Sequence, residues 1–149
     1  MYYLLLIVHV ATAIIFIGGV SVSTSLFPRY ATGEAAARYA EHGGNPAALA
    51  MHRITFFYGR LSLITPVVGL LLAFVVGRAG ELWILLSILL VAAAGALLML
   101  RIVPLQRAML AAPPTDPRTR GRAMGYAGLL NLIWVAILVL MFVQPGSLH

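Results

Sequence analysis

Four long apolar segments separated by polar connections make up most of the chain. The segments cover about residues 2–26, 54–77, 82–103 and 125–144, and the two longer connections cover about residues 27–53 and 104–124. A hydrocarbon core about 30 Å thick needs roughly 20 helical residues, so each segment is long enough to cross it. The pattern predicts an all-α fold: an integral membrane four-helix bundle with a single transmembrane domain over residues 1–149.

Two helix-start signals lie in the longer connections. Asn45-Pro46 and Asp116-Pro117 each place a side chain that caps helices directly before a proline. Proline is favoured at the first helical position, because its ring already has a helical φ and the missing N–H would have no partner there. We therefore expect the second and fourth helices to begin in the aqueous loops, before the membrane.

The composition supports a membrane protein and narrows its chemistry. Hydrophobic residues make up 62% of the chain and charged residues 9%, whereas about a quarter of the residues in a soluble domain are charged. A cleaved signal peptide would have a basic start and a small-residue cleavage site, so the first segment, which lacks Lys and Arg, is expected to stay. The absence of cysteine excludes disulfides, thiolate metal sites and iron–sulfur clusters.

The ten basic side chains are all arginine and are distributed unevenly. Only Arg78 falls in the second connection, and the others lie toward the first and third: Arg29, Arg38, Arg53, Arg60, Arg101, Arg107, Arg118, Arg120 and Arg122. Cytoplasmic loops collect positive charge, so the pattern predicts cytoplasmic longer loops and extracytoplasmic termini. The net charge of +6 then faces anionic lipid headgroups, and the high pI requires no nucleic-acid partner.

One histidine, His9, lies inside the first apolar segment. By helix rise it sits roughly 10 Å below the outer membrane surface. Its imidazole could donate a hydrogen bond to a carbonyl or hydroxyl of a neighbouring helix, as polar groups in membrane spans commonly do. It could equally bind haem or copper, handle protons, or contact a lipid, a quinone or a partner protein, because ionisable residues in spans are costly and often functional.

A second histidine ligand for the same haem is not obvious. His52 precedes the second span at its cytoplasmic end, about 20 Å from His9 along the membrane normal. Two axial nitrogens on one iron lie only about 4 Å apart, given bonds near 2 Å. His42 falls in a surface loop and His149 is the last residue, so a haem bridged by two histidines is disfavoured, whereas a single-histidine or His/Met site stays open.

Arg60 lies about six residues inside the second span. Its long stem can reach the cytoplasmic interface, or its guanidinium can bind an anionic headgroup or a haem propionate on the face it shares with Arg53. One turn further, Pro66 interrupts the backbone hydrogen bonds of the helix and frees a carbonyl. The hydroxyls of Ser62 and Thr65 are expected to hydrogen-bond at that kink.

Methionines and small residues form two further patterns. Thioethers near the cytoplasmic ends could bind Cu(I) together with His52, or could simply fill the core: Met51, Met99, Met109 and Met124. Small residues are expected to permit close helix contacts: Gly18-Gly19, Gly69, Ala92-Ala93-Ala94-Gly95, Gly125 and Gly128. Asn131 is expected to hydrogen-bond across such a contact. The chain has no paired carboxylates, phosphate loop or Ser/His/Asp set, so any enzyme activity would be carried by a cofactor.

Several segments resemble a loose superfamily of small four-helix bacterial membrane proteins, which includes copper-resistance D-type proteins and the HemJ type of protoporphyrinogen oxidase. LLLIVHVATAIIFIGGVSVSTSLFPR resembles their first helix, RLSLITPVVGLLLAF their second and LVLMFVQPG their fourth. WILLSILLVAAAGALLMLRIVPLQRAML is similar to the third helix of the integral membrane family known as domain of unknown function 2269. Together these matches cover most of the chain.

The resemblance implies a multi-pass protein of the bacterial cytoplasmic membrane. In the HemJ type, a first-helix histidine and a third-helix lysine are linked to activity with haem precursors, but the third span here has no lysine, and Arg101 lies at its cytoplasmic end. The copper-resistance relatives imply copper passage, for which a midplane series of Met or His is missing.

We therefore expect an accessory or cofactor-binding membrane component, with haem b or copper as the candidate cofactor. His9 is the candidate metal ligand, and Arg60 and His52 are further candidate cofactor contacts. The alternative is a haem-linked membrane oxidoreductase resembling the HemJ type. The expected partners are membrane lipids and a larger membrane complex or a second copy of the chain.

Overall fold

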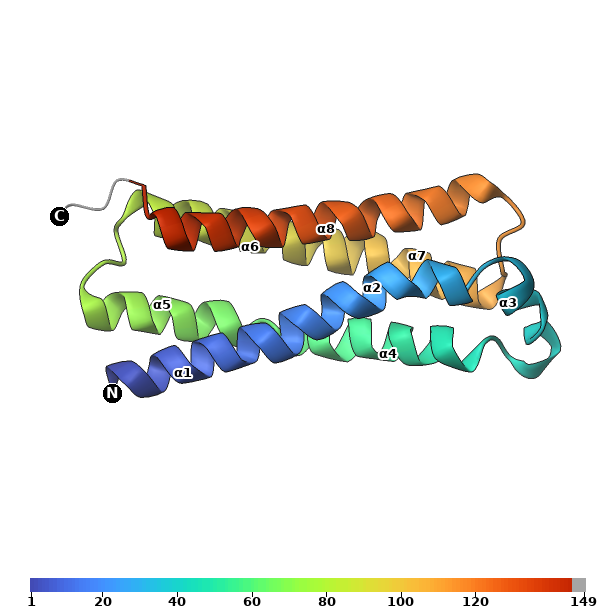
Figure 1. Cartoon of the computed structure of the whole chain (residues 1–149), viewed down its shortest axis with the longest axis horizontal. Helices are drawn as coiled ribbons and strands as arrows, with labels where there is room; N and C mark the ends of the chain where they lie inside the picture. Colours follow the sequence, from blue (N-terminus) through green and yellow to red (C-terminus); the bar gives the residue numbers. More distant parts are fainter. Residues whose placement is uncertain (146–149) are drawn as a thin grey trace.

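The computed structural model describes residues 1–145, and throughout this part of the chain the regular structure is helical. Four long apolar helices run side by side (Figure 1): Tyr2–Tyr30, Pro46–Val76, Leu82–Ala111 and Pro117–Val143. Their length and hydropathy are those of membrane-spanning helices. The predicted all-α fold with four apolar spans is therefore confirmed.

Three of the four long helices are interrupted. The first consists of α1 (Tyr2–Thr12), the π-helical turn η1 (Ala13–Ile17) and α2 (Gly18–Tyr30). The second consists of α4 (Pro46–Leu61) and α5 (Ile64–Val76), and the third of α6 (Leu82–Leu97), the π-helical turn η3 (Leu98–Ile102) and α7 (Val103–Ala111). Helix α8 (Pro117–Val143) is continuous, and the short α3 (Gly33–Ala37) and η2 (Ala40–His42) lie in the first connection.

The two predicted helix starts are confirmed by their caps. The Asn45 side chain accepts a hydrogen bond from the backbone N–H of Ala47 at 2.9 Å, at the start of α4. The Asp116 side chain accepts one from the backbone N–H of Arg118 at 2.9 Å, at the start of α8. Each cap satisfies a first-turn N–H that has no partner within its helix.

The second long helix breaks between α4 and α5, just before Pro66. The Ser62 hydroxyl donates to the Gly59 carbonyl at 2.8 Å, as expected for a side chain that serves the kink. The Thr65 hydroxyl is buried and has no hydrogen-bond partner, so the same expectation is wrong for Thr65. The Thr65 carbonyl, in the first turn of α5, lies within hydrogen-bond distance of another helix, as described below.

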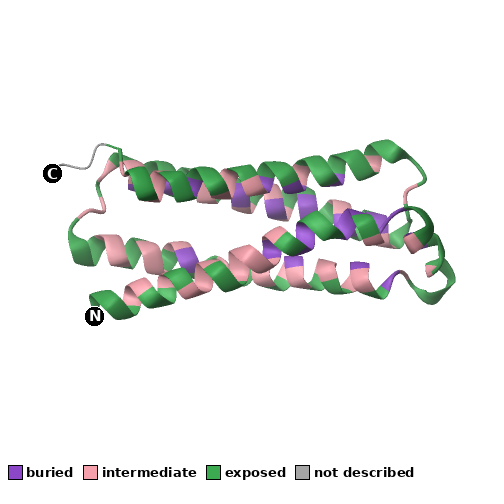
Figure 2. Cartoon of the chain, viewed as in Figure 1, coloured by how far each residue is buried: buried purple, intermediate pink, exposed green. Residues whose placement is uncertain are grey.

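The helices pack tightly toward α3 and separate toward the chain ends. Around α2, α4, α7 and the first half of α8, buried residues gather in the middle and at the α3 end, and few lie near the N-terminus (Figure 2). Toward the chain ends, α1 packs chiefly on α5 and α6 chiefly on α8, and α5 contacts α6 only slightly. That end of the molecule is thus two helix pairs (Figure 1), and no residue of α1 is buried.

Only some of the small residues lie at close helix contacts. A Cβ atom on Gly19 would lie 2.6 Å from the Tyr58 ring, and one on Gly69 would lie 2.6 Å from the His9 ring. Ala94 is fully buried in the core. A Cβ on Gly18, Gly95, Gly125 or Gly128 would meet nothing within 4 Å, so the expected close contact is wrong for these glycines within one copy of the chain.

The connection between α5 and α6 is held by one ion pair. The Arg78 guanidinium donates to both carboxylate oxygens of Glu81, and the Trp83 indole N–H donates to the same carboxylate. The hydrogen bonds that Arg78 donates to Glu81 raise the pKa of Arg78 above its ordinary value. Trp83 lies in the first turn of α6, at the end of a long apolar helix, which is where tryptophan is enriched in membrane proteins.

Candidate functional site

His9 is held against the break in the second long helix. Its Nδ1 atom lies 2.8 Å from the backbone carbonyl oxygen of Thr65. A carbonyl oxygen only accepts hydrogen bonds, so Nδ1 carries the hydrogen. In the neutral imidazole the lone pair is then on Nε2. This is the bond to a carbonyl of a neighbouring helix that was one of the interpretations left open by the sequence.

The absence of a side chain at Gly69 of α5 makes room for the imidazole. Gly69 lies directly against the ring: a Cβ atom there would be 2.6 Å from Cε1 and 2.9 Å from Nδ1 of His9. The Thr65 side chain beside it is only 5% exposed, and its hydroxyl is unpaired. The position of His9 therefore depends on one glycine and one carbonyl more than 50 residues away in the sequence.

The same geometry suits a metal-ligating histidine. Such histidines commonly donate one ring N–H to a carbonyl, which sets the tautomer and presents the other nitrogen to the metal. Within residues 1–145 no group of three or more His, Asp and Glu side chains gathers around a common point. His9 thus offers one nitrogen, which fits an axial haem ligand, whereas copper would need further donors from elsewhere.

His52 lies in a different part of the bundle. Its Nδ1 lies 3.0 Å from Oε1 of Gln106, which joins α4 to α7. Thr65, the partner of His9, follows His52 by 13 residues on the same long helix, a rise of about 20 Å. The structure keeps the two histidines apart, as the depth argument from the sequence requires.

A buried polar network continues from Gln106 into the core. Gln106 Nε2 donates to the Thr55 hydroxyl at 3.4 Å, and that hydroxyl lies 2.9 Å from the Ser23 hydroxyl. Gln106, Thr55 and Ser23 are at most 2% exposed and belong to α7, α4 and α2. Sequence reasoning missed this network, although the rarity of polar residues in apolar helices could have drawn attention to all three.

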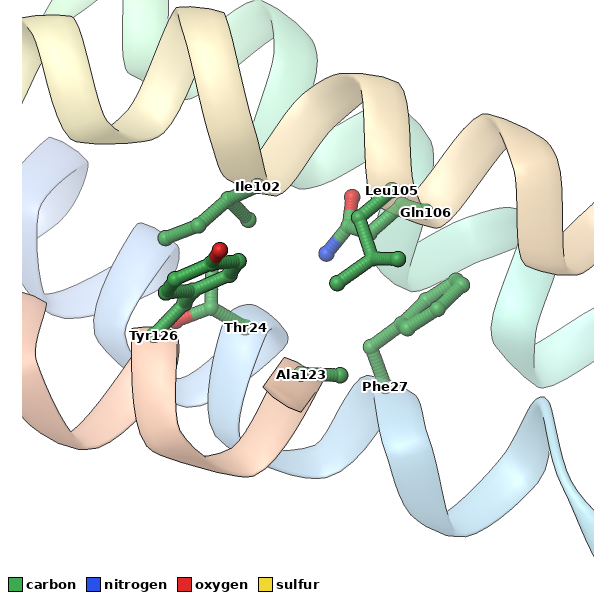
Figure 3. Close-up of a pocket in the computed structure, with 7 residues that line it drawn as sticks. All are labelled: Thr24, Phe27, Ile102, Leu105, Gln106, Ala123 and Tyr126. Carbon is green, nitrogen blue, oxygen red and sulfur yellow. The ribbon is translucent and has the colours of Figure 1, made fainter. Parts of the chain in front are cut away.

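A cavity of about 10 Å³ lies beside the network (Figure 3). The Gln106 amide faces the cavity, and the other lining residues are Thr24, Phe27, Ile102, Leu105, Ala123 and Tyr126. A space of this size holds about one water molecule. It is far too small for haem.

Arg60 and His52 come together around one aromatic ring, on the α3 side of the break. The Arg60 guanidinium carbon lies 3.9 Å from the centroid of the Phe56 ring, one turn toward the start of α4. The Arg107 guanidinium carbon, from α7, lies 5.2 Å from the same centroid, and the His52 and Phe56 rings have centroids 6.4 Å apart. Sequence reasoning missed Phe56 and Arg107, because nothing in the sequence pairs α7 with α4.

The four methionines singled out by the sequence do not share a site. Met109 is buried in a cluster with Phe27 and Met51 packs against it, whereas Met99 packs against the cluster around Leu98. The Met124 side chain is exposed. Core filling therefore accounts for three of them.

A groove of about 510 Å³ runs between α2 and α8, lined by Ser21, Val22, Ser25, Leu26, Asn131, Trp134 and Val135. Asn131 Nδ2 donates to the Ser25 hydroxyl at 3.1 Å, which confirms the predicted hydrogen bond across a helix contact. The Asn131 Oδ1 atom and the Trp134 indole N–H have no partner.

The candidate sites in the described part of the chain thus include a lone histidine at the helix break, a buried polar network beside His52, and a basic cluster around Phe56. Comparisons with protein-family models, curated proteins and solved structures found no match for this chain.

Proposed function

We propose that this chain is an accessory or cofactor-binding component of a bacterial cytoplasmic membrane, working within a larger membrane assembly. The observation that carries the proposal is the separation of α1/α5 from α6/α8 toward the chain ends. In a self-contained four-helix bundle each helix packs against its neighbours around a shared core. The uncovered faces of these helix pairs are suited to a partner helix or a cofactor.

The orientation and the membrane are part of this proposal. The first residues and the end of α8 lie at the same end of the bundle, opposite α3 (Figure 1). Because nine of ten arginines lie toward the α3 side, we assign that side to the cytoplasm. Reporter fusions to the C-terminus and to the first connection test the assignment: a strictly cytoplasmic reporter should fluoresce only in the loop, and fluorescence at the C-terminus would overturn it.

His9 is the residue we propose as the cofactor ligand, with haem b preferred over copper. The supporting observation is the Nδ1 bond to the Thr65 carbonyl, which leaves Nε2 as the ligating atom. Bound haem would supply one-electron chemistry, while His9 would hold the iron and α5 would hold the imidazole in place. A haem-linked oxidoreductase similar to the HemJ type is the second candidate, supported by the first-helix position of His9.

The absorption spectrum of the protein purified from membranes is the deciding measurement. A haem-binding protein should show a Soret band that is lost in His9→Ala and kept in His52→Ala, because His52 lies about 20 Å away. Metal analysis of the same samples would report copper. Equal loss in both variants would contradict the separation of the two sites, and a colourless, metal-free protein would refute the cofactor role while leaving the accessory role.

Native mass spectrometry separates the two functional classes. An accessory component should be released from membranes in mild detergent together with other chains or a second copy, whereas a free-standing haem enzyme should run as one chain and oxidise a haem precursor. A single colourless chain without a partner would refute both.

A further inference from the structure

Two arginines from different helices share one phenylalanine ring at the α3 side of the bundle. The guanidinium carbons of Arg60 and Arg107 lie 3.9 Å and 5.2 Å from the centroid of Phe56. Both side chains are exposed, so an external group can reach them. We name Arg60 and Arg107 the arginine pair.

Within residues 1–145, no carboxylate forms an ion pair with Arg60 or Arg107. The ion pair found among the described residues joins Arg78 to Glu81, between α5 and α6 at the opposite end of the bundle. The remaining acidic residues are Glu34 and Glu41, in the first connection, and Asp116, which caps α8. Two like charges held around one ring repel each other, and an anion between them relieves that repulsion.

The depth of the arginine pair matches a lipid phosphate. Phe56 precedes Val76, the end of α5, by 20 residues, a rise of about 30 Å. This is the thickness of the hydrocarbon core, so when the end of α5 lies at one boundary, Phe56 lies at the other. Arg60, one turn inside, directs its guanidinium back to that boundary, as expected for a long basic side chain near a helix end.

From this charge and depth we propose that the arginine pair binds the phosphodiester of an anionic phospholipid in the leaflet on the α3 side. Guanidinium groups bind phosphate oxygens through paired N–H donors at their edge, which leaves the flat face of the group free to contact an aromatic ring. Basic pockets between membrane helices are suited to such headgroups. A soluble phosphate would bind the same donors but would not need them at the hydrocarbon boundary.

The buried network sets the spacing of the two arginines. Gln106, next to Arg107, bonds to His52 and Thr55 of α4. These bonds hold α7 against α4, so that the two guanidinium groups stay around Phe56 without a ligand. The site is independent of His9, and its test does not depend on a cofactor.

Lipid selectivity measured by electron paramagnetic resonance tests the proposal. The whole chain is reconstituted in phosphatidylcholine vesicles, and the relative association constants of spin-labelled phosphatidylglycerol and spin-labelled phosphatidylcholine are compared. We expect wild type to prefer phosphatidylglycerol, and R60Q and R107Q each to lower that preference by about fivefold. R120Q, which removes an exposed arginine from the start of α8, is the matched control and should change it by less than about 1.5-fold.

A variant that keeps both arginine charges distinguishes a specific binding site from general attraction of anionic lipids to surface arginines. F56L should also lower the preference, by about twofold or more, because the guanidinium groups lose the ring that positions them. R60K keeps the charge and should retain part of the preference. Circular dichroism of each variant checks that the helices are intact.

Three results would overturn the proposal. One is a wild-type protein with no preference for phosphatidylglycerol. Another is an equal loss in R120Q and R60Q, which would assign the preference to general surface charge. The third is displacement of phosphatidylglycerol by excess inorganic phosphate, which would make the ligand a soluble anion.

Discussion

Substituting Gly69 by alanine should displace His9 without touching the histidine itself. A Cβ atom at Gly69 would lie 2.6 Å from Cε1 and 2.9 Å from Nδ1 of the imidazole. Carbon atoms in favourable contact are about 3.5–4.0 Å apart, so the ring must move by about 1 Å or more. That movement breaks the hydrogen bond from Nδ1 to the Thr65 carbonyl.

The change in the free energy of unfolding combines two destabilising contributions and one stabilising contribution. Losing an interhelical hydrogen bond in a membrane costs about 0.6 kcal/mol on average and up to about 1.7. Crowding a packed contact costs about 1–3 kcal/mol, while alanine is favoured over glycine inside a helix by up to about 1 kcal/mol. Gly69→Ala should therefore destabilise the protein by about 1–3 kcal/mol.

In the His9→Ala background the same substitution should become stabilising, because the new methyl group fills the space that the ring left. The expected coupling between the two positions is about 2–3 kcal/mol, the upper end of the range of about 0.5–3 kcal/mol for residues in direct contact. Gly95→Ala is the matched control. A Cβ at Gly95 meets nothing within 4 Å, so its effect should be the same with and without His9.

Unfolding in mixed micelles by added SDS, followed by far-ultraviolet circular dichroism, measures all five variants against wild type. Additive effects of Gly69→Ala and His9→Ala would refute the reasoning, because they would mean that the imidazole does not lie against Gly69. Stabilisation by Gly69→Ala in the wild-type background would refute it as well.

Two further predictions use the same assay. Thr55→Val should cost about 1–2 kcal/mol, because it removes the buried hydroxyl that joins the Gln106 amide to the Ser23 hydroxyl. Thr24→Val, whose hydroxyl bonds only within its own helix, should cost less, and equal costs would contradict a role for the network. Asn45→Ala should cost about 1 kcal/mol through loss of the cap on α4 and of the bond to the Ala35 carbonyl, and no measurable change would contradict the capping role.

The four apolar spans, the two capped helix starts and the distance between His9 and His52 along the helices were readable from the sequence. Each depends on a local property: the hydropathy of a window, a dipeptide such as Asn45-Pro46, or the constant rise of a helix. The separation of His9 from His52 follows from the same arithmetic, and the structure agrees with it. These features required no knowledge of which helix packs on which.

The partners of the polar side chains were decided only by the tertiary structure. His9 meets the Thr65 carbonyl and Gly69, and Arg107 joins Phe56 across two helices. In spans that are apolar on every side, no hydrophobic face marks the rotation of a helix, so its neighbours cannot be read from the pattern. For the same reason Gly19 and Gly69 lie at contacts while Gly125 and Gly128 do not: whether a glycine permits close approach depends on what stands opposite it, which is a property of the packed bundle and not of the residue order.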